Sequence, residues 1–229
     1  MAVILHIETS TTVCSAALSK NGDCLLQKID FEAQSHARLL PLFLKEICTF
    51  LQQHSLKVDA VAVSSGPGSY TGLRIGVSTA KGLCYGWSVP LIAIDTLKIM
   101  ANAFKEKHFV DDGTLLCPMI DARRMEVYNA FYNADLSVMR PTSADIIEQG
   151  CYDDLLQDNK ICFFGNGVSK CKMLLNHSNA FFDETIYPSA QMMIRLAEQA
   201  FEGHDFKDIA YFEPFYLKQF IATIPKQKF

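Results

Sequence analysis

A glycine-rich run over residues 66–76 is the stretch whose residue types and spacing are best suited to chemistry. Gly66 and Gly68 follow an apolar run at residues 58–64 and precede a segment with helical spacing. Glycines at such a turn can take positive φ and bring backbone N–H groups close to a ligand, and the following helix N-terminus favours negative charge. The run therefore indicates a phosphate cradle, although its spacing matches neither the P-loop nor the dinucleotide-binding fingerprint.

The same run also supports an interpretation based on packing. Gly72, Gly76 and Ala80 recur every fourth residue, so one face of the predicted helix is small enough for another helix to lie against it. On local spacing alone, a nucleotide cradle and an ordinary turn followed by a close-packed helix both stay open.

Acidic residues at the ends of two predicted strands are further candidates. Glu8 has no sequence-adjacent lysine or second carboxylate, so we favour a carboxylate that accepts N–H bonds from residues 9–12 over a catalytic base. Asp121, with Arg123 two residues on, either orders a cleft through a charge-assisted hydrogen bond or caps its own turn. No residue is predicted to be catalytic.

Aromatic residues gather near the C-terminus, followed by two lysines. Such a mixture can stack bases and hold phosphates, but aromatic residues of this kind more often dock onto the body of a protein while the lysines stay solvated. The residues are Phe206, Tyr211, Phe212, Phe215, Tyr216 and Phe220, then Lys226 and Lys228.

The elements that must position these residues occur in the same order twice. Each copy is predicted to run three strands, a helix, a strand, a glycine turn, a helix, a strand and a last helix. The first copy includes a hairpin at Asn21-Gly22 and a helix over about residues 35–53, and the second has helical material to about Gln157 and a helix to Leu175. The order predicts an α/β fold of two similar lobes with a cleft between them. The lobes are residues 1–110, with the tail at about 206–229 packing back onto them, and residues 111–205.

Composition places the chain among globular proteins. It has 229 residues, 49% of them hydrophobic and 20% charged, with a formal net charge of −4. That charge gives no overall basic field for holding a nucleic acid. The longest apolar runs fall far short of the ~20 residues that cross a bilayer, so we expect a cytoplasmic protein without membrane contact. The eight cysteines form no C-x-x-C pair and are expected to be mainly buried, reduced thiols.

Motifs spread in order over nearly the whole chain resemble those of the TsaB (YeaZ) family, and the long glycine motif is the most specific of them. They are I-E-T-S-T at residues 7–11, His36 with L-L-P at 39–41, S-G-P-G-S-Y-T-G-L-R-I-G at 65–76, V-P at 89–90, D-A-R at 121–123 with E-V-Y at 126–128, and E-P-F-Y-L-K at 213–218.

The resemblance implies a duplicated two-lobe fold of the actin-like, sugar-kinase-like (ASKHA, RNase H-like) type. It also implies a non-catalytic subunit that supports threonylcarbamoyl transfer to adenosine in tRNA. The implied partners are the catalytic sister subunit TsaD and the ATPase subunit TsaE, with a homodimer in the absence of TsaD and with tRNA held mainly through the complex. No intrinsic cofactor is implied, and ATP or ADP is expected at the junction with the partner.

The resemblance also bears on metal and nucleotide binding. The resemblance implies that the sister subunit binds a metal ion through a His-x-x-x-His pair on one helix. The matching positions here hold Thr96 and Met100, whose side chains cannot replace imidazole as metal ligands. No metal site is therefore expected. The fold implies a degenerate nucleotide site, for which the candidates are Glu8, Thr9, Ser10, Gly66 and Gly68.

A partner interface is predicted on two helices. The apolar positions of residues 35–53 cover two adjoining faces, which is more than one sheet contact needs. The alternative is that the second lobe covers both helices. The predicted interface residues are Leu40, Phe43, Leu44, Ile47, Gly72, Arg74, Gly76 and Ala80.

Three other functions stay open at this point. They are a small-molecule kinase that uses the glycine turn, a metallopeptidase of the same fold, and a homodimeric nucleotide-binding module. The missing histidine pair counts against the peptidase. Glu8 in place of an aspartate, with no base for a substrate hydroxyl, counts against the kinase.

Overall fold

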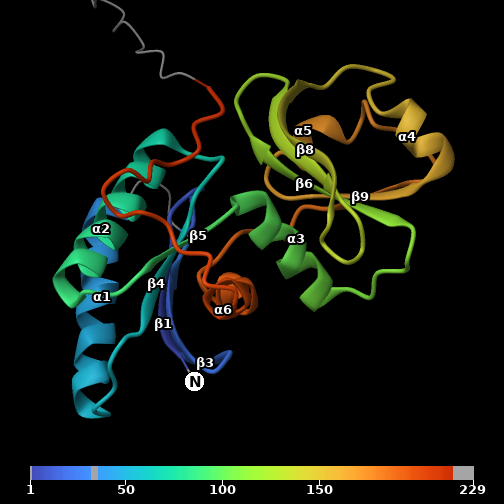
Figure 1. Ribbon diagram of the computed structural model, residues 1–229. Helices are drawn as coiled ribbons and strands as arrows, with labels where there is room; N and C mark the ends of the chain where they lie inside the picture. Colours follow the sequence, from blue (N-terminus) through green and yellow to red (C-terminus); the bar gives the residue numbers. More distant parts are fainter. Residues whose placement is uncertain (1, 32–35, 219–229) are drawn as a thin grey trace, which may run out of the picture.

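Two five-stranded sheets form the frame of the molecule, one in each lobe, in a computed structural model that describes residues 2–31 and 36–218 (Figure 1). The first sheet has the order β3-β2-β1-β4-β5. Its strands β1, β2 and β4 are buried on both faces, which explains their continuous apolar runs. The strands are β1 (Val3–Glu8), β2 (Cys14–Lys20), β3 (Asp23–Asp30), β4 (Ala60–Ser64) and β5 (Leu91–Ile94).

The second sheet repeats this topology. Its order, β10-β9-β6-β7-β8, becomes identical to the first when it is listed from the other edge, so the predicted duplication is confirmed. The predicted hairpin at Asn21-Gly22 is also confirmed, because both residues have positive φ between β2 and β3. The strands of the second sheet are β6 (Thr114–Asp121), β7 (Glu126–Tyr132), β8 (Val138–Ile146), β9 (Lys160–Phe164) and β10 (Ala180–Asp183).

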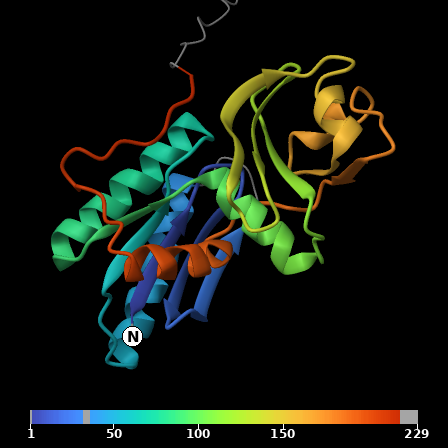
Figure 2. The same ribbon diagram turned by 45° about the vertical axis from the view of Figure 1, so that its right-hand side comes forward.

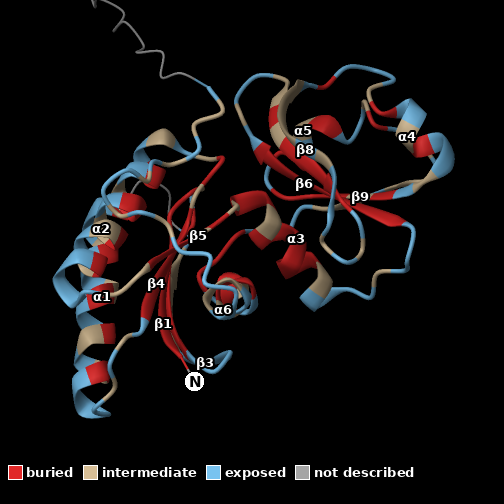
Figure 3. Ribbon diagram, in the orientation of Figure 1, coloured by how far each residue is buried: buried red, intermediate tan, exposed pale blue. Residues whose placement is uncertain are grey.

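Helices α1 (His36–Gln53) and α2 (Tyr70–Trp87) lie side by side on one face of the first sheet (Figures 1 and 2). Their inner faces join the strands in one apolar core, whereas their outer faces are largely exposed (Figure 3). The prediction for α1 is confirmed from His36 to Gln53, and Ser35 lies outside the described residues.

The last helix of each copy crosses to the other lobe. Helix α3 (Thr96–Lys107) follows β5 of the first sheet but packs mainly on β6 and β7 of the second. Helix α6 (Ile194–Glu202), which follows a short 3-10 turn at Gln191–Met193, packs on β1 and β5 of the first sheet. The two lobes therefore share their helices along a common central layer (Figure 2).

The helical segments predicted for the second copy are present but short, and the second ends four residues before Leu175. The structure has only the short helices α4 (Asp153–Asp158) and α5 (Val168–Cys171) there. Aromatic rings occupy much of this core: Phe131 meets Tyr152 edge to face, and Phe163 stacks on Phe182.

Two global predictions concern membranes and cysteines. Within the described residues, no helix is long and apolar enough to span a bilayer. All eight cysteines are free thiols, and Cys14, Cys84, Cys117 and Cys171 are buried, whereas Cys24 is exposed. Apart from Cys24, the thiols are buried or half-buried, as predicted.

Candidate functional site

The glycines of residues 66–76 make room for the chain just after β1. A Cβ atom on Gly72 would lie 2.1 Å from the carbonyl oxygen of Thr9, and one on Gly68 would lie 2.2 Å from that of Ser10. On Gly76 it would lie 2.2 Å from Oγ1 of Thr9. All three distances are far below van der Waals contact, so only glycine fits at these positions.

Hydrogen bonds hold this close contact. The Thr9 hydroxyl donates to the carbonyl oxygen of Gly72 at 2.8 Å, and the Ser69 N–H donates to the carbonyl oxygen of Ser10 at 2.6 Å. Ser69 is also the N-cap of α2, because its hydroxyl accepts the N–H of Gly72. The start of α2 is therefore fastened to the β1–β2 turn of its own chain.

Most of the residues predicted to form the partner interface are instead buried inside the first lobe. Leu40, Leu44 and Ile47 lie in the core between α1 and the sheet, and Gly72, Gly76 and Ala80 are buried at the inner face of α2. These six residues leave almost no exposed surface for a partner. Of the predicted set, Phe43 is half-buried and Arg74 is exposed.

The predicted nucleotide cradle is filled by the chain itself. Gly66 has φ +107°, and a Cβ atom there would lie 2.6 Å from the carbonyl oxygen of Phe215. The Phe215 N–H donates to the carbonyl oxygen of Ser65 at 2.7 Å. A phosphate approaching this turn would meet carbonyl oxygens of Ser10 and Phe215, which repel it.

The other residues predicted to bind a nucleotide are also largely inaccessible to solvent. Glu8, Thr9 and Ser10 have 0% exposed surface, and Gly66 is buried, whereas Gly68 is half-buried. In this conformation the three residues at the end of β1 have no exposed surface that a nucleotide could contact.

Glu8 is a strand-end carboxylate bonded to its own turn. Its Oε1 accepts the backbone N–H of Ser10 at 2.6 Å and the Ser10 hydroxyl at 2.5 Å. The hydroxyl of Ser64, at the end of the neighbouring strand β4, is buried beside this carboxylate. Burial raises the pKa of Glu8 above its ordinary value, and the hydrogen bonds from Ser10 oppose that rise. This is the role that the sequence favoured over a catalytic base.

The raised pKa gives Glu8→Gln a defined pH signature. The folded state holds the Glu8 proton more tightly than the unfolded state does. The contribution of Glu8 to stability is therefore greatest below its ordinary pKa of 4.5 and is lost as the pH rises through the raised value. Glutamine stays neutral, so the Tm of Glu8→Gln relative to wild type is expected to increase from about pH 4 to about pH 8. Thermal melts followed by circular dichroism would measure this Tm difference at each pH. A Tm difference that does not change with pH would contradict the prediction.

The equivalent corner of the second lobe is built in a similar way. Gly165 has φ +110°, close to that of Gly66, and a Cβ atom there would lie 2.5 Å from the carbonyl oxygen of Met119. Asp121 accepts the backbone N–H of Arg123 at 2.9 Å and pairs with Lys170. Asp121 therefore caps its own turn, and its charge-assisted hydrogen bond is with Lys170 rather than with Arg123.

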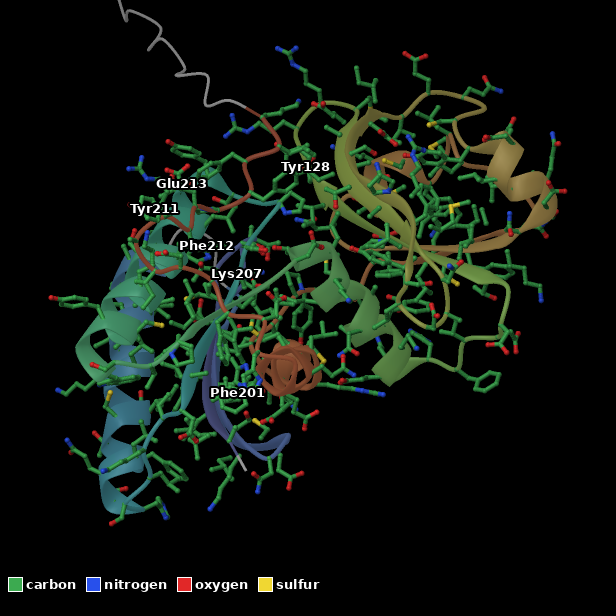
Figure 4. All side chains as sticks on the ribbon, viewed as in Figure 1. Tyr128, Phe201, Lys207, Tyr211, Phe212 and Glu213 are labelled. Atoms are coloured by element: carbon green, nitrogen blue, oxygen red, sulfur yellow. The ribbon has the colours of Figure 1, made fainter. Side chains whose placement is uncertain are left out.

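A C-terminal strap, residues 206–218, runs over the first lobe (Figure 4). The N–H of Lys207 donates to the carbonyl oxygen of Leu91 at 2.8 Å, and Lys81 on α2 donates to the carbonyl oxygen of Phe212 at 3.0 Å. Phe212 packs on the first core, whereas Tyr211 is exposed. The strap thus docks mainly through backbone and apolar contacts. Phe220, Lys226 and Lys228 lie outside the described residues.

The end of the strap reaches the second lobe. Lys218 forms an ion pair with Glu126 on β7, and Tyr216 packs against Tyr70 at the start of α2 with ring centroids 4.8 Å apart. The strap therefore connects the two lobes beside the glycine turn.

Thr96 and Met100, the two positions compared with a His-x-x-x-His pair in the sequence, belong to the core. Thr96 and Met100 on α3 are 0% and 1% exposed, and Met100 packs against Gly165. In the described parts of the chain, no group of three or more histidine, cysteine or acidic side chains could hold a metal ion.

The chain is similar to proteins of one biosynthetic pathway over almost its full length. The family model of TsaD, described as tRNA N6-adenosine threonylcarbamoyltransferase, matches residues 30–226. The tRNA threonylcarbamoyladenosine biosynthesis protein TsaB of Escherichia coli (strain K12) is 30% identical, with 96% of each chain covered. The TsaB protein of Haemophilus influenzae is 29% identical, with 94% of this chain and 93% of that protein covered. The structure of YeaZ from Pseudomonas aeruginosa superposes with a TM-score of 0.77 at 26% identity, covering 95% of this chain and 100% of that one.

Proposed function

The chain belongs to the TsaB (YeaZ) family, and we propose that it acts as a non-catalytic subunit that supports threonylcarbamoyl transfer to adenosine in tRNA. A role in the biosynthesis of tRNA threonylcarbamoyladenosine follows from relatives that match this chain over nearly their whole length. The fold is the duplicated two-lobe fold expected of such a subunit.

The observation that supports a non-catalytic role is the burial of the acid best placed for catalysis. Glu8 ends the first strand, where enzymes of this fold would use a carboxylate, yet it has no exposed surface and bonds to Ser10. Thr96 and Met100 are likewise packed in the core. A general base must come within hydrogen-bond reach of its substrate, and a sealed carboxylate does not.

The partner is proposed to dock on the outer faces of α1 and α2. Leu42 on α1 is 51% exposed, and Tyr85 on α2 is 83% exposed, both large for the surface of a helix. Of the originally predicted set, Arg74 is exposed on α2, whereas Phe43 is half-buried against the core. We propose the catalytic subunit TsaD as this partner, with the ATPase subunit TsaE completing a cytoplasmic complex and a second copy of the chain docking there in the absence of TsaD.

ATP or ADP, if held near this chain, would lie at the junction with the partner. The glycine turn is filled by carbonyl oxygens of the same chain, so it offers no ready cradle of its own. Binding of nucleotide that requires both subunits is the outcome this arrangement favours.

Reconstitution with one component omitted tests the proposed function. Purified TsaD, TsaE, the threonylcarbamoyl donor and tRNA are incubated with and without this chain, and the modified nucleoside is measured after digestion of the tRNA. We expect modification only when the chain is present. The chain alone should hydrolyse no peptide and turn over ATP at most feebly. Robust ATP turnover by the chain alone that Glu8→Gln abolishes would instead favour a kinase.

A further inference from the structure

The turn between β6 and β7 carries two arginines whose side chains have no partner within the described chain. Arg123 and Arg124 are both exposed, and neither guanidinium takes part in a hydrogen bond or ion pair with the described residues. The nearby acids are already neutralised, because Lys170 pairs with Asp121 and Lys218 pairs with Glu126. Among the described residues, the turn therefore presents two positive charges without an ion-pair partner, on a chain whose formal net charge is −4.

The backbone at this turn is unusual for arginine. Arg123 has φ +70° and Arg124 has φ +50°, so two consecutive non-glycine residues occupy the left-handed region. That region is adopted readily by glycine and asparagine and only at a cost by residues with long side chains. Arginine at both positions is thus poorly explained by folding, and the exposed guanidinium groups give a reason to retain it.

Aromatic rings flank these charges. Tyr128 on β7 is half-buried beside Lys218, and Figure 4 shows it next to the strap. Tyr216, on the strap itself, packs on Tyr70 of α2, and the Arg74 guanidinium lies 5.4 Å from the centre of the Tyr70 ring. The Lys218–Glu126 ion pair fixes the strap between the two groups. Arginines and tyrosines from both lobes thereby gather along one rim.

We propose that this rim, consisting of Tyr70, Arg74, Arg123, Arg124, Tyr128 and Tyr216, binds a single-stranded segment of RNA. The fork of an arginine guanidinium matches two phosphate oxygens, and aromatic rings stack on unpaired bases. Two arginines suit a weak local contact with RNA that adds to the RNA binding of a larger assembly. The proposal rests on the proposed function only in naming tRNA as the natural source of that RNA.

A charge-matched pair of double variants tests the proposal on the full-length chain. The probe is a fluorescein-labelled RNA stem-loop, titrated by fluorescence anisotropy from low salt upward. Arg123→Asn with Arg124→Asn is expected to weaken binding about tenfold and to reduce the slope of log K against log salt by about 1.4, because two phosphate contacts are lost. Arg38→Asn with Arg195→Asn removes the same charge from α1 and α6 and should leave the affinity within about twofold of wild type.

The stability of the variant separates binding from folding. Asparagine accepts the left-handed region, so the Arg123/Arg124 variant should melt at or above the wild-type Tm. An equal loss of RNA affinity in both double variants, or none in the Arg123/Arg124 variant, would overturn the proposal. So would equal affinity of the wild type for the stem-loop and for a blunt duplex of the same stem.

The two proposals can fail separately. If modification proceeds without this chain while the arginine variant still loses the stem-loop, the proposed function falls and the RNA contact stands. If modification requires the chain but the arginine variant binds the stem-loop like wild type, only the RNA contact is refuted.

Discussion

Replacement of Gly72 by alanine is expected to destabilise the chain by about 3 kcal/mol, although alanine is normally the better helix residue. The reason is that the new Cβ atom would lie 2.1 Å from the carbonyl oxygen of Thr9, and a backbone atom yields less easily than the end of a flexible side chain. At this chain length the Tm should fall by about 6–12 °C.

Gly82 on the same helix provides a matched control. It is exposed, and a Cβ atom there would meet nothing within 4 Å, so Gly82→Ala should stabilise the chain by about 0.5–1 kcal/mol. Urea unfolding curves of the two variants should therefore shift in opposite directions. Stabilisation by both would contradict the contact between α2 and the β1–β2 turn.

This contact also changes how the partner interface has to be tested. A glutamate at Gly76 would strike Oγ1 of Thr9, so such a variant would lose partner binding by unfolding rather than through the interface. Substitutions that probe assembly belong on exposed positions of α1 and α2.

Leu42→Glu is expected to weaken binding of the proposed partner, TsaD, about 100-fold while leaving the isolated chain folded. Leu42 is 51% exposed on α1, so the substitution removes little buried surface from the monomer. In the complex it would bury a charge within an apolar contact, and truncation or disruption of such central residues costs ~2–4 kcal/mol. Isothermal titration calorimetry against purified TsaD would measure the loss.

Met173→Glu is the control for that experiment. Met173 is 90% exposed in the second lobe, away from α1 and α2, and its replacement adds the same charge. It should bind TsaD like wild type. Equal binding by the Leu42 and Met173 variants would show that the partner docks elsewhere.

The order of strands could be predicted from the sequence because it depends on local signals. Alternating and continuous apolar runs mark the strands, and Asn21-Gly22 marks a hairpin by its backbone requirement alone. Because the same order of strands and helices occurs twice in the sequence, the duplicated topology could also be predicted. The crossing of α3 and α6 between lobes did not follow, because periodicity shows that a helix has an apolar face but not which sheet it meets.

The residues of the candidate site were partly misassigned for the same reason. The spacing of Gly72, Gly76 and Ala80 correctly indicates a surface that something approaches closely. What approaches is Thr9, more than sixty residues upstream, and no local pattern encodes that pairing. The role of Glu8 was predictable, because the Ser10 N–H lies only two residues away. The positive φ of Arg123 and Arg124 could not be read from residues that usually avoid it.

Because α6 packs on the first sheet, the first lobe cannot be completed until late in synthesis at the ribosome. The strands of the first sheet are complete once Ile94 has been made, but α6, which covers their second face, begins at Ile194. At ~5–20 residues per second, the intervening hundred residues take about 5–20 s. Throughout that interval the nascent first lobe presents Ile4, Ala62 and Ile92 without the α6 side chains that later bury them. The first lobe is made first, yet it is finished last, and a chaperone that recognises apolar β-strands would find its substrate in that interval.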